Sequence, residues 1–138
     1  MSERNKLLFG LFFLRLGLGL FFLFVAIDKM VNPNSSIEKI ALHYSLNISN
    51  SIAVLLGSCQ LVFGLFFILG SYKNLTYLFA LLIHMFTSFV WYYNCINFFG
   101  SQSDLFAHIS LNFAFLALFI CKDFDTKFSL DKKRSLFS

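Results

Sequence analysis

The sequence is poor in charge. Only 13% of its 138 residues are Asp, Glu, Lys or Arg, whereas soluble domains are about a quarter charged. Hydrophobic residues make up 58% of the chain, and phenylalanine alone supplies 21 residues. There is too little polar surface to cover a water-soluble globule of this size. We therefore interpret the chain as an integral membrane protein, with the lipid bilayer as its solvent and partner.

Proline, cysteine and catalytic motifs are also scarce. One proline and seven glycines leave little room for disordered linkers. The three cysteines, Cys59, Cys95 and Cys121, lie far apart and form no C-x-x-C pair, which argues against a disulfide framework and against metal-ligand spacing. The sequence has no Gly-rich phosphate loop, no Ser-His-Asp order and no haem motif. We predict no catalytic residue, no metal site and no covalently bound cofactor.

Four apolar runs reach or approach the roughly 20 residues that a membrane-crossing helix needs. They cover residues 7–27, 51–70, 74–93 and 105–121. We expect the first run to be a retained helix and not a cleaved signal peptide, because it carries Arg15 and lacks a small-x-small site before Asp28. The turn between the second and third runs is very short, so these helices must be antiparallel neighbours. The sequence predicts one all-α transmembrane domain over residues 1–138, an integral membrane four-helix bundle.

Lysine and arginine are distributed unequally about these runs. Most of them fall on the side of the two termini, and only Lys29 and Lys39 fall on the other side. The positive-inside rule places both termini in the cytoplasm, which makes residues 122–138 a cytoplasmic basic tail. The net charge of +4 is then explained by anionic headgroups and topology, and we expect no nucleic-acid partner.

The first outer loop contains a short amphipathic pattern. In SSIEKIALHY, residues 35–44, apolar side chains recur at helical spacing on one face. Ser35 and Glu38 have the spacing of a capping box. We predict a short helix that lies on the outer membrane surface or folds back over the bundle.

Each predicted span carries one strongly polar side chain at a similar depth. These are Arg15, Gln60, His84 and Asn112. Arg15 lies eight residues into its run, about 12 Å below the inner boundary, where a charge costs roughly 3 kcal/mol or more. The sequence suggests no carboxylate at its depth. Three alternatives follow for Arg15. Its side chain bends toward the inner headgroups, or it forms hydrogen bonds with Gln60, Asn112 and free carbonyls. In the third alternative it binds a ligand with a polar or anionic head, such as a quinone or a lipid phosphate.

The other polar residues also have a structural interpretation. Amide and imidazole side chains often join membrane helices by hydrogen bonds without taking part in a reaction. We favour this structural role for Gln60 and Asn112. Gln60 shares a stripe with Gly57 and Gly64, which predicts a face in close contact with another helix. The role of His84 stays undecided: it joins helices in the same way, or it relays protons or forms a hydrogen bond to a quinone. For Arg15 we favour a functional role, because a joining role does not need a permanent charge.

Three stretches resemble the DoxX family. LRLGLGLFFLFVAIDKMVNP, residues 14–33, is similar to the opening helix of that family. LLGSCQLVFGLFFILGSYKNLTYLFALLIHMF, residues 55–86, is similar to its second and third helices, with Gln60 where the family often has a glutamate. HISLNFAFLALFI, residues 108–120, resembles the last helix, and Asn112 matches an asparagine that often opens it.

The resemblance implies a four-helix, multi-pass protein of the bacterial inner (cytoplasmic) membrane. The family includes a small subunit of a thiosulfate:quinone oxidoreductase and partners of membrane redox-defence complexes. The glutamine at position 60 removes an ionisable partner that could have neutralised Arg15, which argues against family-type redox or proton chemistry within this chain.

We therefore expect a small subunit of a quinone-linked membrane redox complex, with redox cofactors supplied by a partner protein. Any oxidoreductase activity would belong to the complex and not to this chain alone. The quinone or lipid head would be bound by Arg15, Gln60, His84 and Asn112, with His108 and Asp104 as secondary residues. Two alternatives stay open: a structural or assembly subunit without a ligand, associated with a protein partner or with copies of itself, and a lipid-binding or transport protein.

Overall fold

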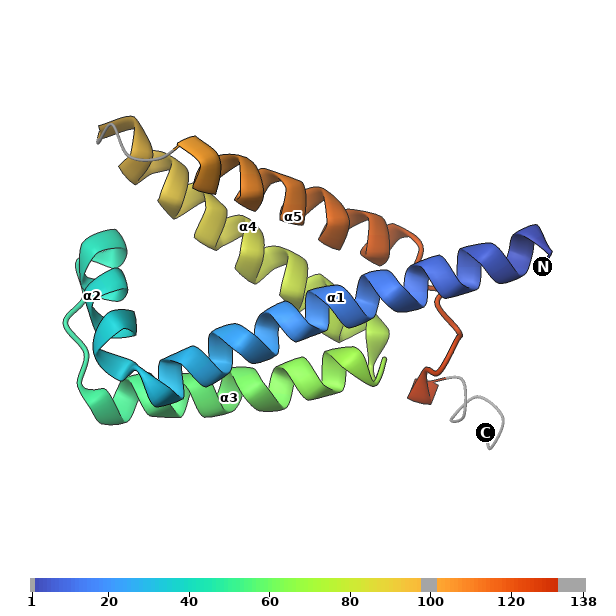
Figure 1. Cartoon of the computed structure of the whole chain (residues 1–138), viewed down its shortest axis with the longest axis horizontal. Helices are drawn as coiled ribbons and strands as arrows, with labels where there is room; N and C mark the ends of the chain where they lie inside the picture. Colours follow the sequence, from blue (N-terminus) through green and yellow to red (C-terminus); the bar gives the residue numbers. More distant parts are fainter. Residues whose placement is uncertain (1, 98–101, 132–138) are drawn as a thin grey trace.

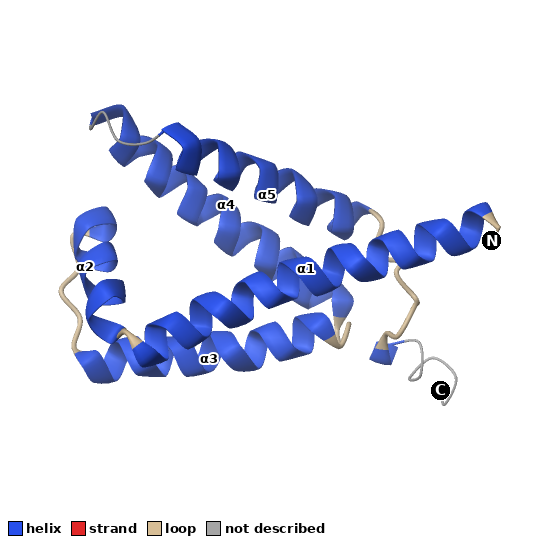
Figure 2. Cartoon of the chain, in the orientation of Figure 1, coloured by secondary structure: helices blue, strands red, loops and turns tan. Residues whose placement is uncertain are grey.

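The computed structural model describes residues 2–97 and 102–131, apart from the side chains of residues 91, 93–97 and 102–106. These described residues form helices and connecting loops, without any strand (Figure 2). In chain order the helices are α1 (Glu3–Val31), α2 (Pro33–Tyr44), α3 (Asn50–Ile68), α4 (Lys73–Asn97) and α5 (Gln102–Ile120). The prediction of an all-α fold is confirmed.

Three of these helices are long and apolar enough to cross a membrane. They are α1, α3 and the part of α4 from Lys73 to Val90, whereas the apolar part of α5, Ala107–Ile120, is shorter. α1 starts before and ends after the apolar run at 7–27, because Ser2 accepts a hydrogen bond from the backbone N–H of Asn5 at its start and polar residues at both ends suit the helix dipole. α1 thus extends at both ends beyond its apolar run into polar sequence.

The long helices are arranged as two side-by-side pairs, α1 with α3 and α4 with α5 (Figure 1). The predicted contact face of α3 packs against α1. A Cβ atom on Gly57 would lie 2.9 Å from the backbone oxygen of Ala26, and one on Gly64 would lie 2.9 Å from a methyl group of Leu23. The absence of side chains at these two positions is what allows the helices of the first pair to approach so closely.

An aromatic core joins all four long helices. Phe22 of α1 packs against Phe115 of α5, with ring centroids 5.4 Å apart, and Phe67 of α3 packs against Tyr77 of α4 at 5.0 Å. All four rings are buried, with exposed fractions of 4% or less. These ring contacts therefore hold the two helix pairs together.

Helix α2 lies at the end where the two pairs diverge (Figure 1) and contacts α1, α3 and α4. The ring of Tyr44, at its last residue, stacks on Phe86 of α4 with a centroid distance of 6.2 Å. The prediction of a helix here is confirmed, but its predicted cap is wrong. The helix begins earlier, at Pro33 after the cap residue Asn32, because the fixed φ of proline suits the first helical position.

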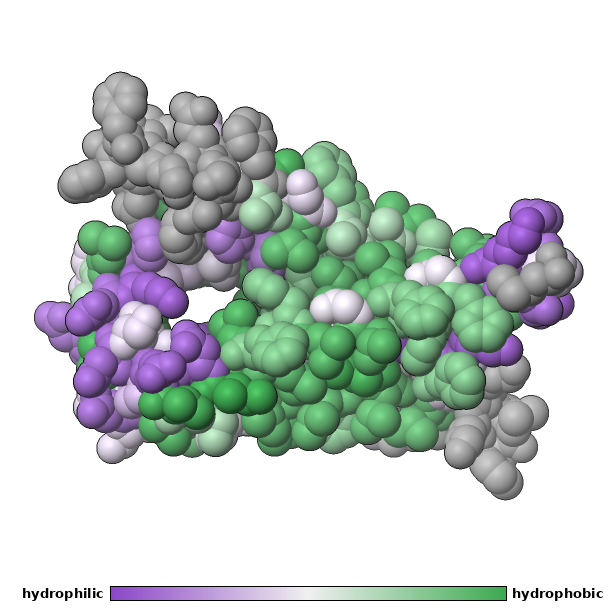
Figure 3. Space-filling model, in the orientation of Figure 1, coloured by the Kyte–Doolittle hydropathy of each residue, from purple (hydrophilic) through white to green (hydrophobic). Residues whose placement is uncertain are grey.

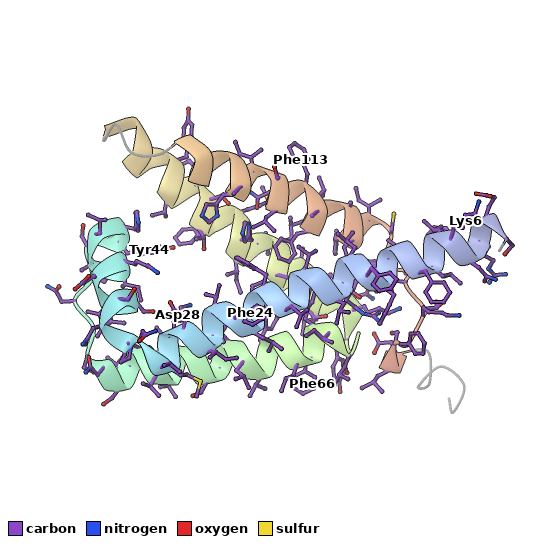
Figure 4. The ribbon with its side chains drawn as sticks, in the orientation of Figure 1. Lys6, Phe24, Asp28, Tyr44, Phe66 and Phe113 are labelled. Carbon is purple, nitrogen blue, oxygen red and sulfur yellow. The ribbon has the colours of Figure 1, made fainter. Side chains whose placement is uncertain are left out.

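The face of the molecule shown in Figure 3 has an apolar middle and polar ends. Figure 3 shows green residues over the long helices, with purple residues gathered around α2 and around the start of α1. Phe24, Phe66 and Phe113 project outward from three different helices in Figure 4 and are 67%, 44% and 68% exposed. An apolar belt between two polar ends is the surface that a bilayer requires of a membrane protein.

Candidate functional site

The guanidinium of Arg15 is completely buried and has a carboxylate partner. Its Nη1 donates a hydrogen bond to Oδ2 of Asp125 at 2.7 Å, an ion pair in which both side chains are 0% exposed. Its Nη2 donates to the backbone oxygen of Lys127 at 2.7 Å. The hydroxyl of Tyr77 donates to the same carboxylate oxygen. The expectation that Arg15 has no carboxylate at its depth is therefore wrong, although the expected bonds to free carbonyls are present.

The carboxylate reaches Arg15 because residues 122–131, the C-terminal segment, fold back over the turn between α3 and α4. The backbone N–H of Leu130 donates to the carbonyl of Leu69 at 3.0 Å, and the hydroxyl of Ser129 donates to the carbonyl of Gly70 at 2.9 Å. An arginine on a helix leans toward the N-terminus of that helix, which brings the guanidinium toward this end of the molecule.

Gly70 makes room for this arrangement. It has a φ of +60°, and α3 ends there in a Schellman motif, with Ser71 N–H bonded to Phe66 O at 3.1 Å and Gly70 N–H bonded to Phe67 O at 3.0 Å. A Cβ atom on Gly70 would lie 2.7 Å from Nη1 of Arg15. Glycine is needed here both for the left-handed backbone and for the space occupied by the guanidinium.

The same segment supports the start of α4. The carboxylate of Asp131 accepts hydrogen bonds from the backbone N–H groups of Tyr72 and Lys73 at 2.9 and 2.8 Å. A carboxylate at a helix N-terminus is favoured by the helix dipole and satisfies otherwise unpaired donors. The ammonium of Lys73 in turn donates to the carbonyl of Asp125 at 2.9 Å. The cluster around Arg15 is thus a joint between α1, α4 and the C-terminal segment.

A second polar cluster joins α4 and α5. Nδ1 of His84 lies 2.8 Å from Oδ1 of Asn112, and Oγ of Ser88 lies 3.5 Å from the same nitrogen. His84 is only 4% exposed. The two residues were expected at similar depth on neighbouring spans, and the structure brings them into contact. Ser88 is an additional member one helical turn along α4.

Aromatic rings surround His84. The ring of Phe21 meets it edge-on at 5.8 Å, and those of Phe115 and His108 lie 5.1 and 5.4 Å away. Nε2 of His84 is buried and has no hydrogen-bond partner among the described residues. Figure 3 shows that the molecule is hollowed between α2 and the apolar belt. We call His84, Ser88 and Asn112, with the rings of Phe21, His108 and Phe115, the His84 site.

Gln60 belongs to neither cluster. Its Nε2 donates to the backbone oxygen of Phe22 at 3.3 Å, and its Oε1 accepts from Nζ of Lys29 at 2.5 Å. Gln60 therefore joins α3 to α1, as its position on the glycine stripe predicts, and it pairs with a lysine near the end of α1. The side chain of Asp104 lies outside the described residues, so its role as a secondary site residue stays a prediction.

The four predicted site residues thus occupy three places. Only His84 and Asn112 bind each other, whereas Arg15 binds the C-terminal segment and Gln60 binds Lys29. Tyr77 and Asp125 are the residues around Arg15 that sequence reasoning missed. A signal for Asp125 was present, because a buried guanidinium requires a counter-charge and the segment KDFDTKF, residues 122–128, carries two carboxylates.

The two clusters differ in what they can do. In the Arg15 cluster the charge is already neutralised by a protein carboxylate, so its interactions serve mainly to hold chain segments together. The His84 site has a fixed, buried imidazole whose outer nitrogen is unused by the described residues. That nitrogen can form a hydrogen bond with a ligand group of moderate polarity, and the neighbouring rings can contact a planar apolar body.

A family model described as DoxX matches residues 10–94 of the chain. The match covers most of α1, all of α2 and α3, and most of α4, including Arg15, Gln60 and His84. No curated protein and no solved structure matches the chain.

Proposed function

The chain belongs to the DoxX family of membrane proteins, and from this premise we propose that it is a small subunit of a quinone-linked membrane redox complex. Its own part is to bind and position a quinone ring at the His84 site. The partner protein supplies the redox cofactors and the electron transfer. We place it in the bacterial inner membrane as a multi-pass four-helix bundle with both termini in the cytoplasm.

One observation carries the proposal: the outer nitrogen of His84 is buried among rings and lacks a hydrogen-bond partner in the described part of the chain. A buried polar group without a partner costs about 1–3 kcal/mol, and in hydrocarbon no water is present to satisfy it. The quinone-quinol pair offers a flat ring for the aromatic walls and oxygen groups for hydrogen bonding, so it fits both parts of the site.

The charge distribution supports the proposed orientation. Arg4 and Lys6 lie in the first turns of α1, and the ammonium of Lys127 lies over the ring of Phe9 of the same helix. Lys73 donates to the carbonyl of Lys122. At the other end of α1, Lys29 lies in its last turn and Lys39 of α2 pairs with Asp28. An excess of Lys and Arg marks the cytoplasmic side. The C-terminal segment packs at the same end as the start of α1, which agrees with two termini on one side.

The test is to measure quinone that purifies with the protein. The protein and its His84→Leu variant are purified from membranes in mild detergent, and extracted quinone and quinol are quantified together per protein chain. We expect the variant to retain about tenfold less of this quinone-quinol pool, because it loses the hydrogen bond at Nε2 and the geometry of the site. The matched control is Thr87→Val, whose hydroxyl bonds only to Ile83 O of its own helix in the described residues. Equal quinone in all three proteins would overturn the proposal.

A structural or assembly role is the second candidate, and the Arg15 cluster favours it. The ion pair with Asp125 joins residues 110 positions apart and uses the buried charge within the chain itself. A pull-down of the surrounding complex separates the two candidates. An assembly subunit that needs no ligand would bring down the same partners from His84→Leu cells and show no quinone in any variant.

A further inference from the structure

We infer that the His84 site binds the reduced member of the quinone pair, a quinol, through a hydroxyl group that donates to Nε2 of His84. This inference rests on the proposed function and goes further, because it names the redox state that the site selects. The positions of the hydrogen atoms around His84 determine this selectivity.

The hydroxyl of Ser88 has already committed its hydrogen. Its Oγ donates to the backbone oxygen of His84, one turn earlier in α4, at 2.7 Å. A serine hydroxyl has one hydrogen and two lone pairs, so the Oγ atom can only accept a bond from the imidazole. This atom lies 3.5 Å from Nδ1 of His84.

The second group beside Nδ1 is also an acceptor. Oδ1 of Asn112 lies 2.8 Å from this nitrogen, and a side-chain amide oxygen carries no hydrogen. Two acceptor oxygens facing one ring nitrogen require a hydrogen on that nitrogen. Asn112 and Ser88 together therefore fix the proton of a neutral His84 on Nδ1.

A neutral imidazole with its hydrogen on Nδ1 has a bare lone pair on Nε2. The ring is neutral because a charged imidazolium is costly to bury among apolar rings, and Phe21 and Phe115 supply such an environment. Nε2 is thus a buried hydrogen-bond acceptor that has no donor among the described residues. The carbonyl oxygens of a quinone can only accept, whereas the two hydroxyl groups of a quinol can donate.

The consequence is selectivity by redox state. Placing a quinone oxygen against the lone pair of Nε2 sets two acceptors against each other, and binding a quinol forms a hydrogen bond in a water-poor site. We expect the quinol to bind at least about tenfold more tightly than the quinone of the same tail. The site would then hold the product of a quinone-reducing partner or the substrate of a quinol-oxidising one.

The first test reads the proton position directly. Protein labelled with ¹⁵N-histidine is placed in lipid nanodiscs, and the His84 signals are assigned by their loss in His84→Leu. We expect the ¹⁵N chemical shift of Nδ1 to be that of a protonated, pyrrole-type nitrogen. The ¹⁵N chemical shift of Nε2 should be that of an unprotonated, pyridine-type nitrogen. A protonated Nε2, in either the neutral or the charged ring, overturns the inference without any ligand being present.

The second test compares three probes of matched shape: decyl-benzoquinone, its hydroquinone, and the dimethyl ether of that hydroquinone, which has no donor. Binding to the nanodisc protein is measured under anaerobic conditions. We expect tight binding for the hydroquinone only. In Asn112→Leu the ratio of hydroquinone to quinone affinity should fall toward one, because Nδ1 loses its nearer acceptor and keeps only the Ser88 Oγ at 3.5 Å. Thr87→Val should retain the preference.

Each outcome has a distinct meaning. Quinone bound as tightly as hydroquinone, or a preference that persists in Asn112→Leu, overturns the inference but leaves the quinone-linked function standing. If none of the three probes binds the unmodified protein, the proposed function fails and the inference fails with it. The ¹⁵N measurement on the unmodified chain keeps the inference testable even if Asn112→Leu does not fold.

Discussion

Arg15 and Asp125 are a buried ion pair whose members depend on each other. Both side chains are 0% exposed, so neither charge can be rehydrated when the other is removed. We predict that Asp125→Leu lowers the free energy of unfolding by about 3–5 kcal/mol, because it leaves an uncompensated guanidinium in the interior. The measurement is reversible unfolding in detergent micelles, followed by circular dichroism.

The double variant Arg15→Met with Asp125→Leu should recover most of that loss. In the described residues, Nε of Arg15 and Oδ1 of Asp125 are buried without a hydrogen-bond partner, so the native pair is incompletely satisfied and apolar replacements can match it. As a control, Lys6→Met breaks the exposed pair of Lys6 and Glu3 and should change little. A double variant that is less stable than Asp125→Leu alone would contradict this account.

Gly70 provides a second residue-scale prediction. Gly70→Ala should destabilise the protein by about 2 kcal/mol or more, because alanine is strained at a φ of +60° and its methyl group would displace the Arg15 guanidinium. Gly17→Ala is the matched control, since a Cβ atom there meets nothing within 4 Å and helix propensity favours alanine. Unfolding curves of both variants check the prediction, and equal stability of the two would refute it.

Arg15 also shows where sequence reasoning ended at the residue scale. Its depth and cost could be predicted from its position in an apolar run, but its partner could not. Asp125 lies 110 positions away in a segment without helical periodicity, and loop closure over such a distance leaves no local pattern. The pairing of His84 with Asn112 was accessible, because both lie on periodic helices where position sets depth.

At the scale of elements, the contact between α1 and α3 depends on what each glycine faces. Gly57 faces the backbone oxygen of Ala26, which cannot move without bending α1, whereas Gly64 faces the end of the flexible Leu23 side chain. We predict that Gly57→Ala costs about 1–3 kcal/mol and that Gly64→Ala costs less than about 1 kcal/mol. Parallel unfolding measurements decide between them. A larger loss for Gly64→Ala would show that the two contacts are ranked wrongly.

The elements themselves were largely accessible from the sequence, and their ends were less so. Long apolar runs predicted α1, α3, α4 and α5, because a bilayer allows few other structures. The start of α2 was misplaced at Ser35, since a capping box and a proline at the first helical position compete as signals and Pro33 prevailed. α3 ends before residue 70 because the chain turns left-handed at Gly70, a conformation that hydropathy does not encode.

At the scale of the whole molecule, one end carries most of the described Lys and Arg residues, the start of α1 and the folded-back C-terminal segment. The opposite end carries α2 and the loop that follows it (Figure 1). The two helix pairs diverge toward the second end (Figure 1), where the molecule is hollowed between α2 and the apolar belt (Figure 3). Access for a lipid-soluble ligand is therefore expected from the α2 side.

This arrangement predicts which positions can be labelled from each side of the membrane. The three native cysteines, Cys59, Cys95 and Cys121, are first replaced by serine. Single cysteines are then introduced as Ser2→Cys, Asn47→Cys and Phe24→Cys, and intact spheroplasts are treated with a membrane-impermeant maleimide.

Asn47→Cys, in the exposed loop after α2, should be labelled, and Ser2→Cys should react only after the membrane is opened. Phe24→Cys should stay unlabelled in both cases although this side chain is 67% exposed, because hydrocarbon covers it and disfavours the reactive thiolate. Labelling of Ser2→Cys in intact spheroplasts would reverse the orientation, and rapid labelling of Phe24→Cys would show that the apolar belt does not lie in the bilayer.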